Sequence, residues 1–202
     1  KYYSAEGQAA PFERQALIKL RHIAGDAALG KKVETHRDSF VYSGAPWDLT
    51  VALDLRRQQV KQLVEPGQIN LKHSHGGIVT LEYAIQYLQV MHGHRHPSLR
   101  TPNTLRALAA LIDVGLIPRA TGENLRKSYL FIRMLIDGLR MVRGNTKDLV
   151  IPPPDSDEFI FLARRVGYQT EDWQAGARHL QTDIEEHMKQ NRQFFEKMFG
   201  KV

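Results

Sequence analysis

Two adjacent glycines, Gly76 and Gly77, come directly before the most apolar helical stretch of the sequence. Glycines at the start of a helix can expose backbone N–H groups and the positive end of the helix dipole to an anion, and Lys72 would lie nearby. The alternative is a tight turn that packs closely against its neighbours and needs no ligand. Two glycines are a weak motif, and we favour the structural turn.

Glu82 is a single carboxylate at the edge of the apolar face of the helix that follows. A carboxylate in that position must be paired or protonated, because burial of an unpaired charge is costly. Gln86 lies one turn further along and can hydrogen-bond to it, and Lys72 or an arginine from another helix can neutralise it. We favour a structural pair over contact of Glu82 with a nucleotide, a metal or a partner.

Histidines are concentrated in one part of the chain, where His73, His75, His92, His94 and His96 lie within 24 residues. Pairs of histidines separated by one residue are usable metal ligands. No Asp or Glu accompanies them at ligand spacing, and the chain has no cysteine. We therefore expect no metal site and interpret these residues as solvated loop histidines.

Carboxylates that could support phosphoryl chemistry are scarce. A nucleotidyl transferase needs two or three carboxylates that converge on Mg²⁺ beside a phosphate-holding turn. Asp155 and Asp157 form the only Asp-x-Asp pair, and their position after three prolines predicts a helix N-cap. No glycine-rich phosphate loop, nucleophile elbow or HExxH motif is present. We assign no catalytic residue and expect the chain to be inactive by itself.

Composition is that of an ordinary globular protein: 202 residues, 42% hydrophobic and 25% charged. The net charge is +6, but the basic residues are spread along the chain without interleaved exposed aromatics, which makes nucleic acid an unfavoured partner. The lack of cysteine fits a reducing compartment. No apolar run approaches the ~20 residues of a membrane span, so we expect a cytoplasmic protein with no membrane partner. The start at Lys1 suggests a piece of a longer protein.

Apolar residues recur at helical spacing along almost the whole chain, and sustained strand alternation is absent. The sequence therefore predicts an all-α fold, a multi-helix bundle with a smaller N-terminal helical portion. We expect that portion in residues 1–66 and a helical bundle domain in residues 67–202. Between them, an extended connector containing Gly76 and Gly77 is bracketed by helix-breaking residues.

Capping residues predict where several helices begin. The first helix is expected to run from Pro11 to near Gly25, and Asp26 is the predicted N-cap of the second. Thr101 is the predicted cap of a later helix. The last helix, at about 170–199, has a heptad-like seam that predicts partner helices: Trp173, Ala177, Leu180, Ile184, Met188, Phe195 and Met198.

Three segments form an ordered series of motifs: FERQALIKLRHIAGDAALG at 12–30, LKHSHGGIVTLEYAIQ at 71–86 and KSYLFIRMLIDGLR at 127–140. They resemble motifs of the glutamine synthetase adenylyltransferase (glutamate-ammonia-ligase adenylyltransferase) family, which read WERQALIKARPVAGD, IKLGPGGIREIEFIVQ and AYLFLRRLEHRLQ. The likeness covers nearly the whole chain, and the order of the motifs is more specific than any one of them.

This resemblance implies a nucleotidyltransferase domain with a G-S-x-x-D-x-D signature, followed by an all-α domain that opens with the Gly-Gly helix segment. Residues 1–66 would be the end of the first domain or the linker from it. The implied function is that of an accessory or regulatory domain in an enzyme that transfers AMP from ATP to a tyrosine of glutamine synthetase, or removes it, in nitrogen regulation. The implied partners are the upstream nucleotidyltransferase domain, glutamine synthetase and the PII signalling protein. No cofactor is expected in this chain, whereas Mg²⁺ and ATP are expected for the full-length enzyme.

The resemblance also marks single positions that would face a nucleotide or the catalytic domain. Thr80 departs from the pattern, because the family usually has an acid there, and Gly138 stands where the family has a polar residue. The alternative function is a diverged, stand-alone helical module that binds a partner without catalysis. The matching positions are Arg14, Lys19, Arg21, Lys72, Gly76, Gly77, Glu82 and Arg133.

Overall fold

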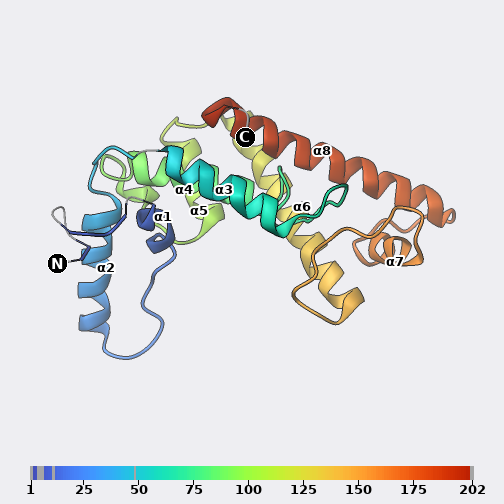
Figure 1. The fold of residues 1–202 in the computed structure, drawn as a ribbon, viewed down its shortest axis with the longest axis horizontal. Helices are drawn as coiled ribbons and strands as arrows, with labels where there is room; N and C mark the ends of the chain where they lie inside the picture. The colour runs from blue at the N-terminus through green and yellow to red at the C-terminus, as the bar shows by residue number, and fades with distance from the viewer. Residues whose placement is uncertain (1, 4–6, 11, 48, 201–202) are drawn as a thin grey trace. The chain divides into compact units, whose positions relative to one another are not determined.

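The computed structural model describes residues 2–3, 7–10, 12–47 and 49–200. Within these residues all regular structure is helical apart from one isolated antiparallel bridge between Asn70 and Val150, which confirms the predicted all-α fold (Figure 1). The α-helices are α1 (Glu13–Leu17), α2 (Ala27–Val41), α3 (Leu49–Leu63), α4 (Ile78–His92), α5 (Thr104–Asp113), α6 (Arg119–Arg143), α7 (Asp157–Arg165) and α8 (Trp173–Phe199), and a short 3-10 helix, η1, spans Pro97–Leu99.

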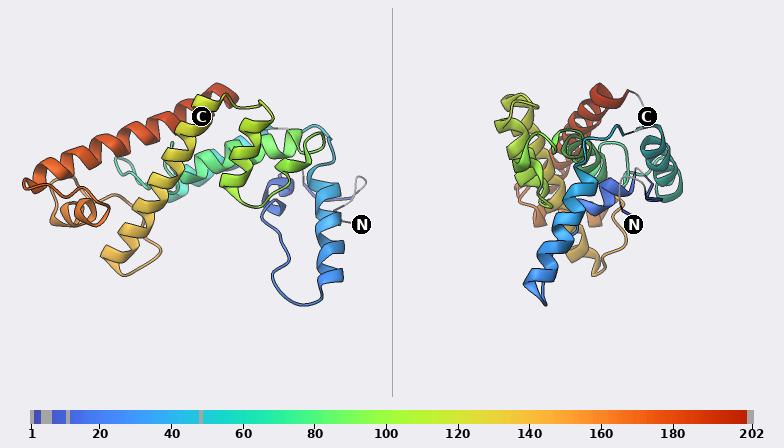
Figure 2. Two further views of the ribbon diagram at one scale, coloured as in Figure 1. Left: turned by 180° about the vertical axis from the view of Figure 1, so that it is seen from behind. Right: turned by 90° about the vertical axis from the view of Figure 1, so that its left-hand side faces the viewer.

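The chain divides into two compact units, each built from two separate stretches of sequence. Unit 1 comprises Lys1–Leu55 and Glu82–Gly122, and unit 2 comprises Arg56–Leu81 and Glu123–Val202. Figure 2 shows the helices of both units from two further directions. The predicted domain boundary between residues 66 and 67 stays a prediction.

Unit 1 has a small apolar core at the end of α2 and the adjoining parts of α3 and α4. Burial of these side chains is the main favourable term in holding such short helices together. The Trp47 and Tyr87 rings pack with their centroids 5.5 Å apart, and the Arg100 guanidinium lies 5.7 Å from the centroid of the Tyr42 ring. The buried members of this core are Ile18, Val41, Tyr42, Trp47, Ala52 and Val90.

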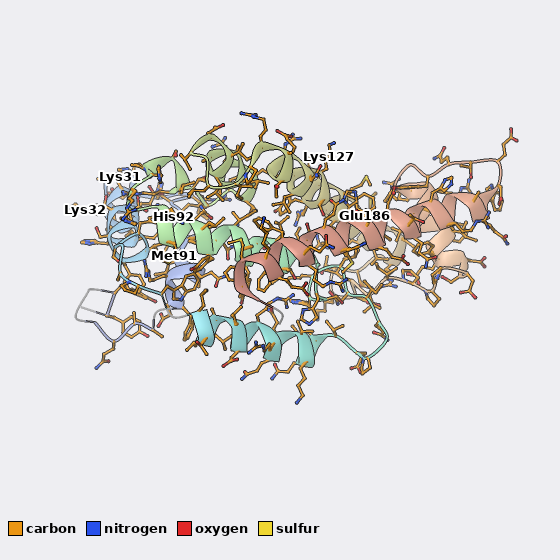
Figure 3. The ribbon with its side chains drawn as sticks, turned by 90° about the horizontal axis from the view of Figure 1, so that it is seen from above. Lys31, Lys32, Met91, His92, Lys127 and Glu186 are labelled. Carbon is orange, nitrogen blue, oxygen red and sulfur yellow. The ribbon has the colours of Figure 1, made fainter. Side chains whose placement is uncertain are left out.

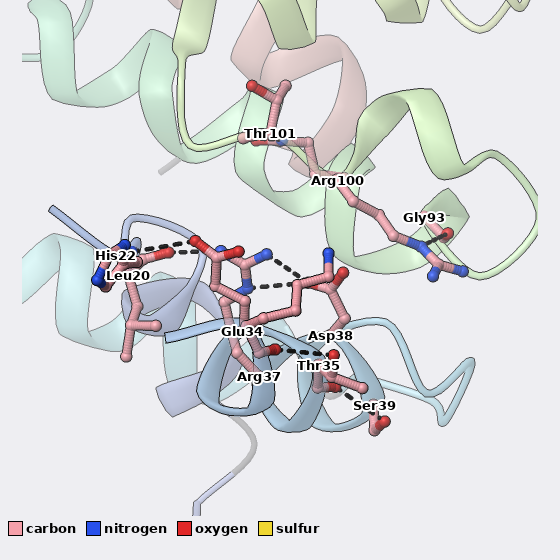
Figure 4. Close-up of polar contacts among 12 residues, drawn as sticks. Leu20, His22, Glu34, Thr35, Arg37, Asp38, Ser39, Gly93, Arg100 and Thr101 are labelled. Atoms are coloured by element: carbon pink, nitrogen blue, oxygen red, sulfur yellow. Dashed lines mark hydrogen bonds and ion pairs between the residues drawn. The ribbon is translucent and has the colours of Figure 1, made fainter. Parts of the chain in front are cut away.

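Helix α1 is much shorter than predicted, because it ends at Leu17 rather than near Gly25. Side chains of α2 hydrogen-bond to backbone groups that a longer α1 would have paired within the helix. The Arg37 guanidinium donates to the Leu20 carbonyl over 2.5 Å, and the His22 N–H donates to Glu34 over 3.0 Å (Figure 4). The predicted start at Pro11 lies outside the described residues.

Two of the predicted caps have different outcomes. Asp26 caps α2 as predicted, accepting a hydrogen bond from the Leu29 N–H at 2.9 Å. The cap of α5 is Asn103, which accepts from the Arg106 N–H at 3.0 Å, so the prediction of Thr101 was wrong by two residues. The Thr101 hydroxyl accepts a weaker hydrogen bond, 3.3 Å long, from the N–H of Asn103.

Unit 2 is built around α6, α7 and α8, and the predicted apolar seam of α8 is largely confirmed. Trp173 is the exception, because it is 57% exposed and carries the Arg164 guanidinium 5.0 Å from its ring centroid. Gly138 on α6 has no room for a side chain, since a Cβ there would lie 2.8 Å from Val166 Cγ1. Five residues of the predicted seam are buried, Ala177, Leu180, Ile184, Met188 and Phe195, whereas Met198 is half-buried. Gly176 and Asn191 are buried residues of α8 that the prediction did not include.

Candidate functional site

The connector before α4 lies outside the helices, as predicted, but residues 71–77 are not extended as we expected and instead form successive turns. Asn70 organises the first of them: its side-chain oxygen accepts hydrogen bonds from the N–H groups of Lys72 and His73 at 2.9 and 3.0 Å. Ser74 closes the turn, because its hydroxyl accepts from the Asn70 N–H at 2.8 Å and its own N–H donates to the Asn70 carbonyl. This Asx-type arrangement competes with extended backbone, so the segment folds back on itself.

Both glycines of the motif sit where a side chain cannot fit. Gly76 has φ +89°, and a Cβ built on it would lie 2.1 Å from the carbonyl oxygen of Met188 on α8. A Cβ on Gly77 would lie 2.7 Å from the carbonyl oxygen of Leu71. Gly76 therefore needs glycine both for its backbone conformation and for close approach to neighbouring main chain, whereas Gly77 needs it for close approach.

The amide groups at the start of α4 are all used inside the protein. The Gly76 N–H donates to Thr80 Oγ1 at 3.1 Å, the Gly77 N–H to the Ser74 carbonyl at 2.9 Å, and the Ile78 N–H to the Leu71 carbonyl at 3.0 Å. An anion at this helix start would have to displace these bonds. The geometry thus fits the structural turn that we favoured and offers no open set of N–H donors in this segment.

Asn191 of α8 joins the turn that contains Gly76 and Gly77, called the glycine turn below, to the buried face of α8 in unit 2. It is fully buried, and its amide nitrogen donates to the Gly76 carbonyl at 3.0 Å. Nearby, the Ser128 hydroxyl of α6 donates to the His187 carbonyl of α8 at 3.1 Å. These contacts fix the turn to the bundle through polar atoms that have little access to water, where hydrogen bonds contribute most to a unique geometry.

Arg56 is the main residue that sequence reasoning missed. It is 1% exposed, and one guanidinium nitrogen donates to the His73 carbonyl at 2.8 Å, to Thr80 Oγ1 at 3.0 Å and to the Ser74 carbonyl at 3.3 Å. Arg56 lies in the run LRRQQVK at 55–61, among the basic residues that are spread along the chain. Arg56 follows Ala52 and precedes Val60 by four residues each, so it lies on the inner stripe of α3, and that spacing was the available signal.

His73 and His75 lie beside this guanidinium and are affected by it. Burial, followed by the charges of Lys72 and Arg56, lowers the pKa of His73 to about 4. Burial also lowers the pKa of His75, with smaller contributions from Arg56 and Arg192. Neutral imidazoles at this turn keep further positive charge away from the buried arginine.

Arg14 of unit 1 is buried against the end of α2. Its guanidinium donates twice to the Val41 carbonyl, at 3.0 and 2.9 Å, and once to the Ala45 carbonyl at 2.9 Å. These are carbonyls at and beyond the C-terminus of α2, where a cation also interacts favourably with the helix dipole. Arg14 therefore has a clear structural role.

Lys19 and Glu82 come together in unit 1, although 62 residues separate them in sequence. The Lys19 ammonium donates to Thr104 Oγ1 at 2.8 Å and to the Pro102 carbonyl at 3.1 Å. Burial lowers the pKa of Lys19, and the charge of Glu82 opposes that shift. Lys19 is thus a cation close enough to Glu82 for their charges to interact, where we had named Lys72 or an arginine.

Beside this pair, two buried amides link α1 to α4. The Gln15 side chain donates to the Gln86 side-chain oxygen at 2.8 Å. Both residues border a small cavity of about 240 Å³ that Lys19 and Tyr83 also line. The arrangement is a polar contact between helices beside a partly open apolar pocket.

The remaining predicted positions are exposed. Arg21 lies in the segment after α1, Lys72 lies in the connector turn, and Arg133 lies on α6. The structure therefore distributes the predicted residues among several places: a turn in unit 2, two internal contacts in unit 1, and exposed surfaces.

The histidines, and the Mg²⁺ of the implied enzyme, raise the question of a metal site. Within residues 2–3, 7–10, 12–47 and 49–200, no group of three or more His, Asp or Glu side chains is arranged to hold a metal ion. His92 is at the end of α4 (Figure 3), and burial followed by the charges of His96, His94 and Arg95 lowers its pKa. We therefore assign no metal ligand to the described part of the chain. None of the described helices combines the length and apolar character that crossing a membrane requires.

The fold and these contacts define an all-helical domain whose motif glycines and buried arginines bind its own backbone. The sequence model of the GlnD PII-uridylyltransferase family matches residues 51–199. The chain therefore belongs to this family.

Curated relatives extend the match. A bifunctional glutamine synthetase adenylyltransferase/adenylyl-removing enzyme of Mycobacterium bovis is 36% identical over 157 residues, which are 76% of this chain and 16% of that protein. The enzyme of the same description from Corynebacterium efficiens is 32% identical over 184 residues, 90% of this chain and 17% of that protein. The one from Hahella chejuensis is 35% identical over 139 residues, 66% of this chain and 14% of that protein.

These relatives confirm the predicted resemblance to glutamine synthetase adenylyltransferases. The chain spans only about a sixth of their length, 16% and 17% in the first two comparisons. Its similarity is thus to one part of a much larger enzyme.

Proposed function

We propose that this chain is the helical, non-catalytic domain of an enzyme that transfers AMP from ATP to a tyrosine of glutamine synthetase, or removes it, in nitrogen regulation. The observation that carries the proposal is the similarity of 76% to 90% of the chain to a single part of bifunctional glutamine synthetase adenylyltransferases. Such a part acts by holding and orienting a catalytic domain, with the reacting groups supplied elsewhere.

The geometry supports a positioning role. The motif glycines and Arg14 make close contacts with the protein's own main chain, which gives a rigid scaffold. Exposed motif residues, Arg21, Lys72 and Arg133, remain for contact with another domain. In this proposal the nucleotidyltransferase domain binds ATP and Mg²⁺, the two domains act together in the cytoplasm, and glutamine synthetase and the PII protein are the partners.

A transfer assay tests the proposal directly. Purified 202-residue chain, the longer parent polypeptide and a mixture of the two are each given ATP labelled at the α-phosphate, Mg²⁺ and glutamine synthetase. We expect label on glutamine synthetase only where the parent is present. Labelling by the 202-residue chain alone would falsify the non-catalytic role, and a silent parent would support the diverged interaction module.

A second candidate follows from the description of the family model, which is that of a PII-uridylyltransferase. Transfer of UMP to the PII protein would need the same kind of helical domain beside a different substrate. A parallel assay with labelled UTP and PII protein separates the two. We expect AMP transfer to be the faster reaction, because the curated relatives described above are adenylyltransferases.

A further inference from the structure

A continuous groove runs along α8 inside unit 2 and meets the glycine turn at one end, where Ser74, His75 and Met188 line it. It consists of two neighbouring hollows of about 620 and 660 Å³. Five residues border both hollows and so form the middle of the groove: Gly67, Gln68, Ile69, Ile184 and Glu185.

The floor of the groove is apolar and partly accessible. Ile69 is 39% exposed although it lies at the centre, and Val150 and Ile151 beside it are half-buried. Exposed aliphatic side chains that lie together in a groove indicate a binding site better than scattered ones do. Covering them with a ligand removes contiguous apolar surface from water, which favours binding.

The two ends of the groove carry opposite charge. Apart from Glu185 in the middle of the groove, the described lining of the first hollow has two acids, Asp148 and Glu158, and one cation, Arg143, whose guanidinium pairs with Glu158 at 2.5 Å and Asp148 at 2.8 Å. The first end therefore has an excess of negative charge.

The second hollow has the reverse balance. Its lining includes the cations Lys61, Lys189 and Arg192 with two acids, Glu65 and the shared Glu185. A ligand that fits both ends must therefore present a positive group to the first and a negative group to the second.

The backbone at the edge of the groove favours an extended chain as the ligand. Residues around Asn70 and Val150 form a two-stranded bridge, in which the Leu71 N–H donates to the Leu149 carbonyl and the Ile151 N–H donates to the Ile69 carbonyl. Within the described residues the Val150 carbonyl makes no hydrogen bond, so it is available to the N–H of an added strand. Such pairing is a common way for a sheet edge to bind a peptide.

We propose that this groove binds an extended segment of another polypeptide that carries a basic residue, alternating aliphatic residues and an acidic residue, with the basic end against Asp148 and Glu158 and the acidic end against Lys189 and Arg192. The length is consistent with this partner. The lining residues of α8 run from Gln181 to Arg192, which corresponds to about 16 Å of helix. Extended chain rises ~3.3 Å per residue, so about five to seven residues cover that distance, with alternate side chains facing the floor.

Two blocked, fluorescently labelled heptapeptides test the proposal. In KSISISE the Lys, both Ile and the Glu share one face of an extended chain, and KSESISI has the same composition with the Glu moved next to the Lys on that face, so that neither chain direction places a charge at both ends. Binding to the 202-residue chain is measured by fluorescence anisotropy at low ionic strength. We expect KSISISE to bind about ten-fold more tightly than KSESISI, because in either chain direction KSESISI places its Glu over the apolar middle of the groove or against like charge and leaves one charged end without a partner.

Matched variants locate the site. Lys189→Glu should reduce or reverse the preference, whereas Lys127→Glu, the same charge change on α6 (Figure 3), should leave it unchanged. Ile69→Ser should weaken both peptides with little change in the thermal unfolding midpoint, since this side chain is partly exposed.

Three outcomes would overturn the proposal. They are no binding of either peptide at about 1 mM, a level that marks negligible affinity, equal binding of KSISISE and KSESISI, and equal effects of Lys189→Glu and Lys127→Glu. Concentration-dependent dimerisation that Ile69→Ser abolishes would assign the groove to a second copy of this chain and would also contradict it.

Discussion

The Arg56 guanidinium donates to Thr80 Oγ1 over 3.0 Å, and both side chains are buried in unit 2. In the resemblance drawn from the sequence, Thr80 stands where the family pattern is expected to have an acid. The contact shows that a side chain at this position faces a buried arginine, the natural partner of a carboxylate. The presence of threonine at position 80 therefore changes a contact inside the protein, at the glycine turn.

Replacing Arg56 should destabilise the protein. Arg56→Met keeps much of the aliphatic stem but leaves the His73 carbonyl, the Ser74 carbonyl and Thr80 without this donor, and we expect a loss of about 2–4 kcal/mol. The free energy of unfolding is measured by urea titration. Arg126→Met, at an exposed position of α6, is the control and should change it by less than about 0.5 kcal/mol. Equal effects of the two variants would contradict the assigned role.

The Thr80 hydroxyl should matter apart from its size. Thr80→Val has nearly the same shape but offers no acceptor to Arg56 or to the Gly76 N–H, so we expect about 1–2 kcal/mol of destabilisation. Thr182→Val, at an exposed position of α8, is the matched control. A thermal midpoint for Thr80→Val as high as that of Thr182→Val would show that the two bonds contribute nothing net.

Gly76 should tolerate alanine poorly because of the close main chain of α8. Gly76→Ala should cost about 2–4 kcal/mol, from the positive φ together with a Cβ 2.1 Å from the Met188 carbonyl oxygen. Gly144 also has positive φ, +64°, but a Cβ added there would meet nothing within 4 Å. Gly144→Ala should therefore cost only about 1 kcal/mol. The difference between the two variants in unfolding free energy, measured by urea titration, gives the cost of the steric clash with α8. No difference between the variants would mean that α8 moves away freely.

Lys19 and Arg21 are both basic positions of the first motif, and only Lys19 has a described internal contact. Lys19→Met should cost about 1–2 kcal/mol, because it removes the bonds to Pro102 and Thr104 and takes a positive charge away from Glu82. Arg21→Met should be nearly neutral in the same chemical denaturation measurement. If Arg21→Met is the more damaging, the assignment of Lys19 as the structural residue is wrong.

Stability should depend on pH through His73. Its pKa is lowered in the folded protein from 6.5 to about 4, so the unfolded chain takes up this proton first as the pH falls. The contribution is fully present above pH 6.5 and is lost as the pH decreases from 6.5 towards 4. His73→Gln should therefore make the fall of unfolding free energy shallower over this interval. His75, whose pKa is lowered in the same direction, keeps part of the slope. Identical slopes for the variant and the wild type would exclude His73 as a contributor.

Helical periodicity predicted the fold class and several helices well. The helix of Ile78–His92 and the N-cap Asp26 follow from local sequence, because apolar spacing and a side-chain cap act within a few residues. The early end of α1 could not be predicted in this way. It depends on Arg37 and Glu34 of α2, which reach back to the backbone of Leu20 and His22.

The packing role of the two glycines could be predicted from the sequence better than the placement of the charged residues. Gly76 and Gly77 precede a helix, where glycine allows a tight turn against packed neighbours, so their packing role could be favoured from sequence. Arg56 and Arg57 are adjacent and chemically identical, yet only Arg56 is buried. Which of two neighbouring arginines faces inward depends on the rotation of α3 against the connector, a tertiary property that composition does not contain.

The interleaving of the two units limits how the chain can be cut. Each unit takes residues from two stretches, with changes between Leu55 and Arg56, Leu81 and Glu82, and Gly122 and Glu123. All three changes fall inside helices, α3, α4 and α6. No single stop codon or protease nick can release either unit intact. Fragment expression and domain-swap chimaeras should therefore keep both units together, since a break at any one crossing leaves half of a helix without its remainder.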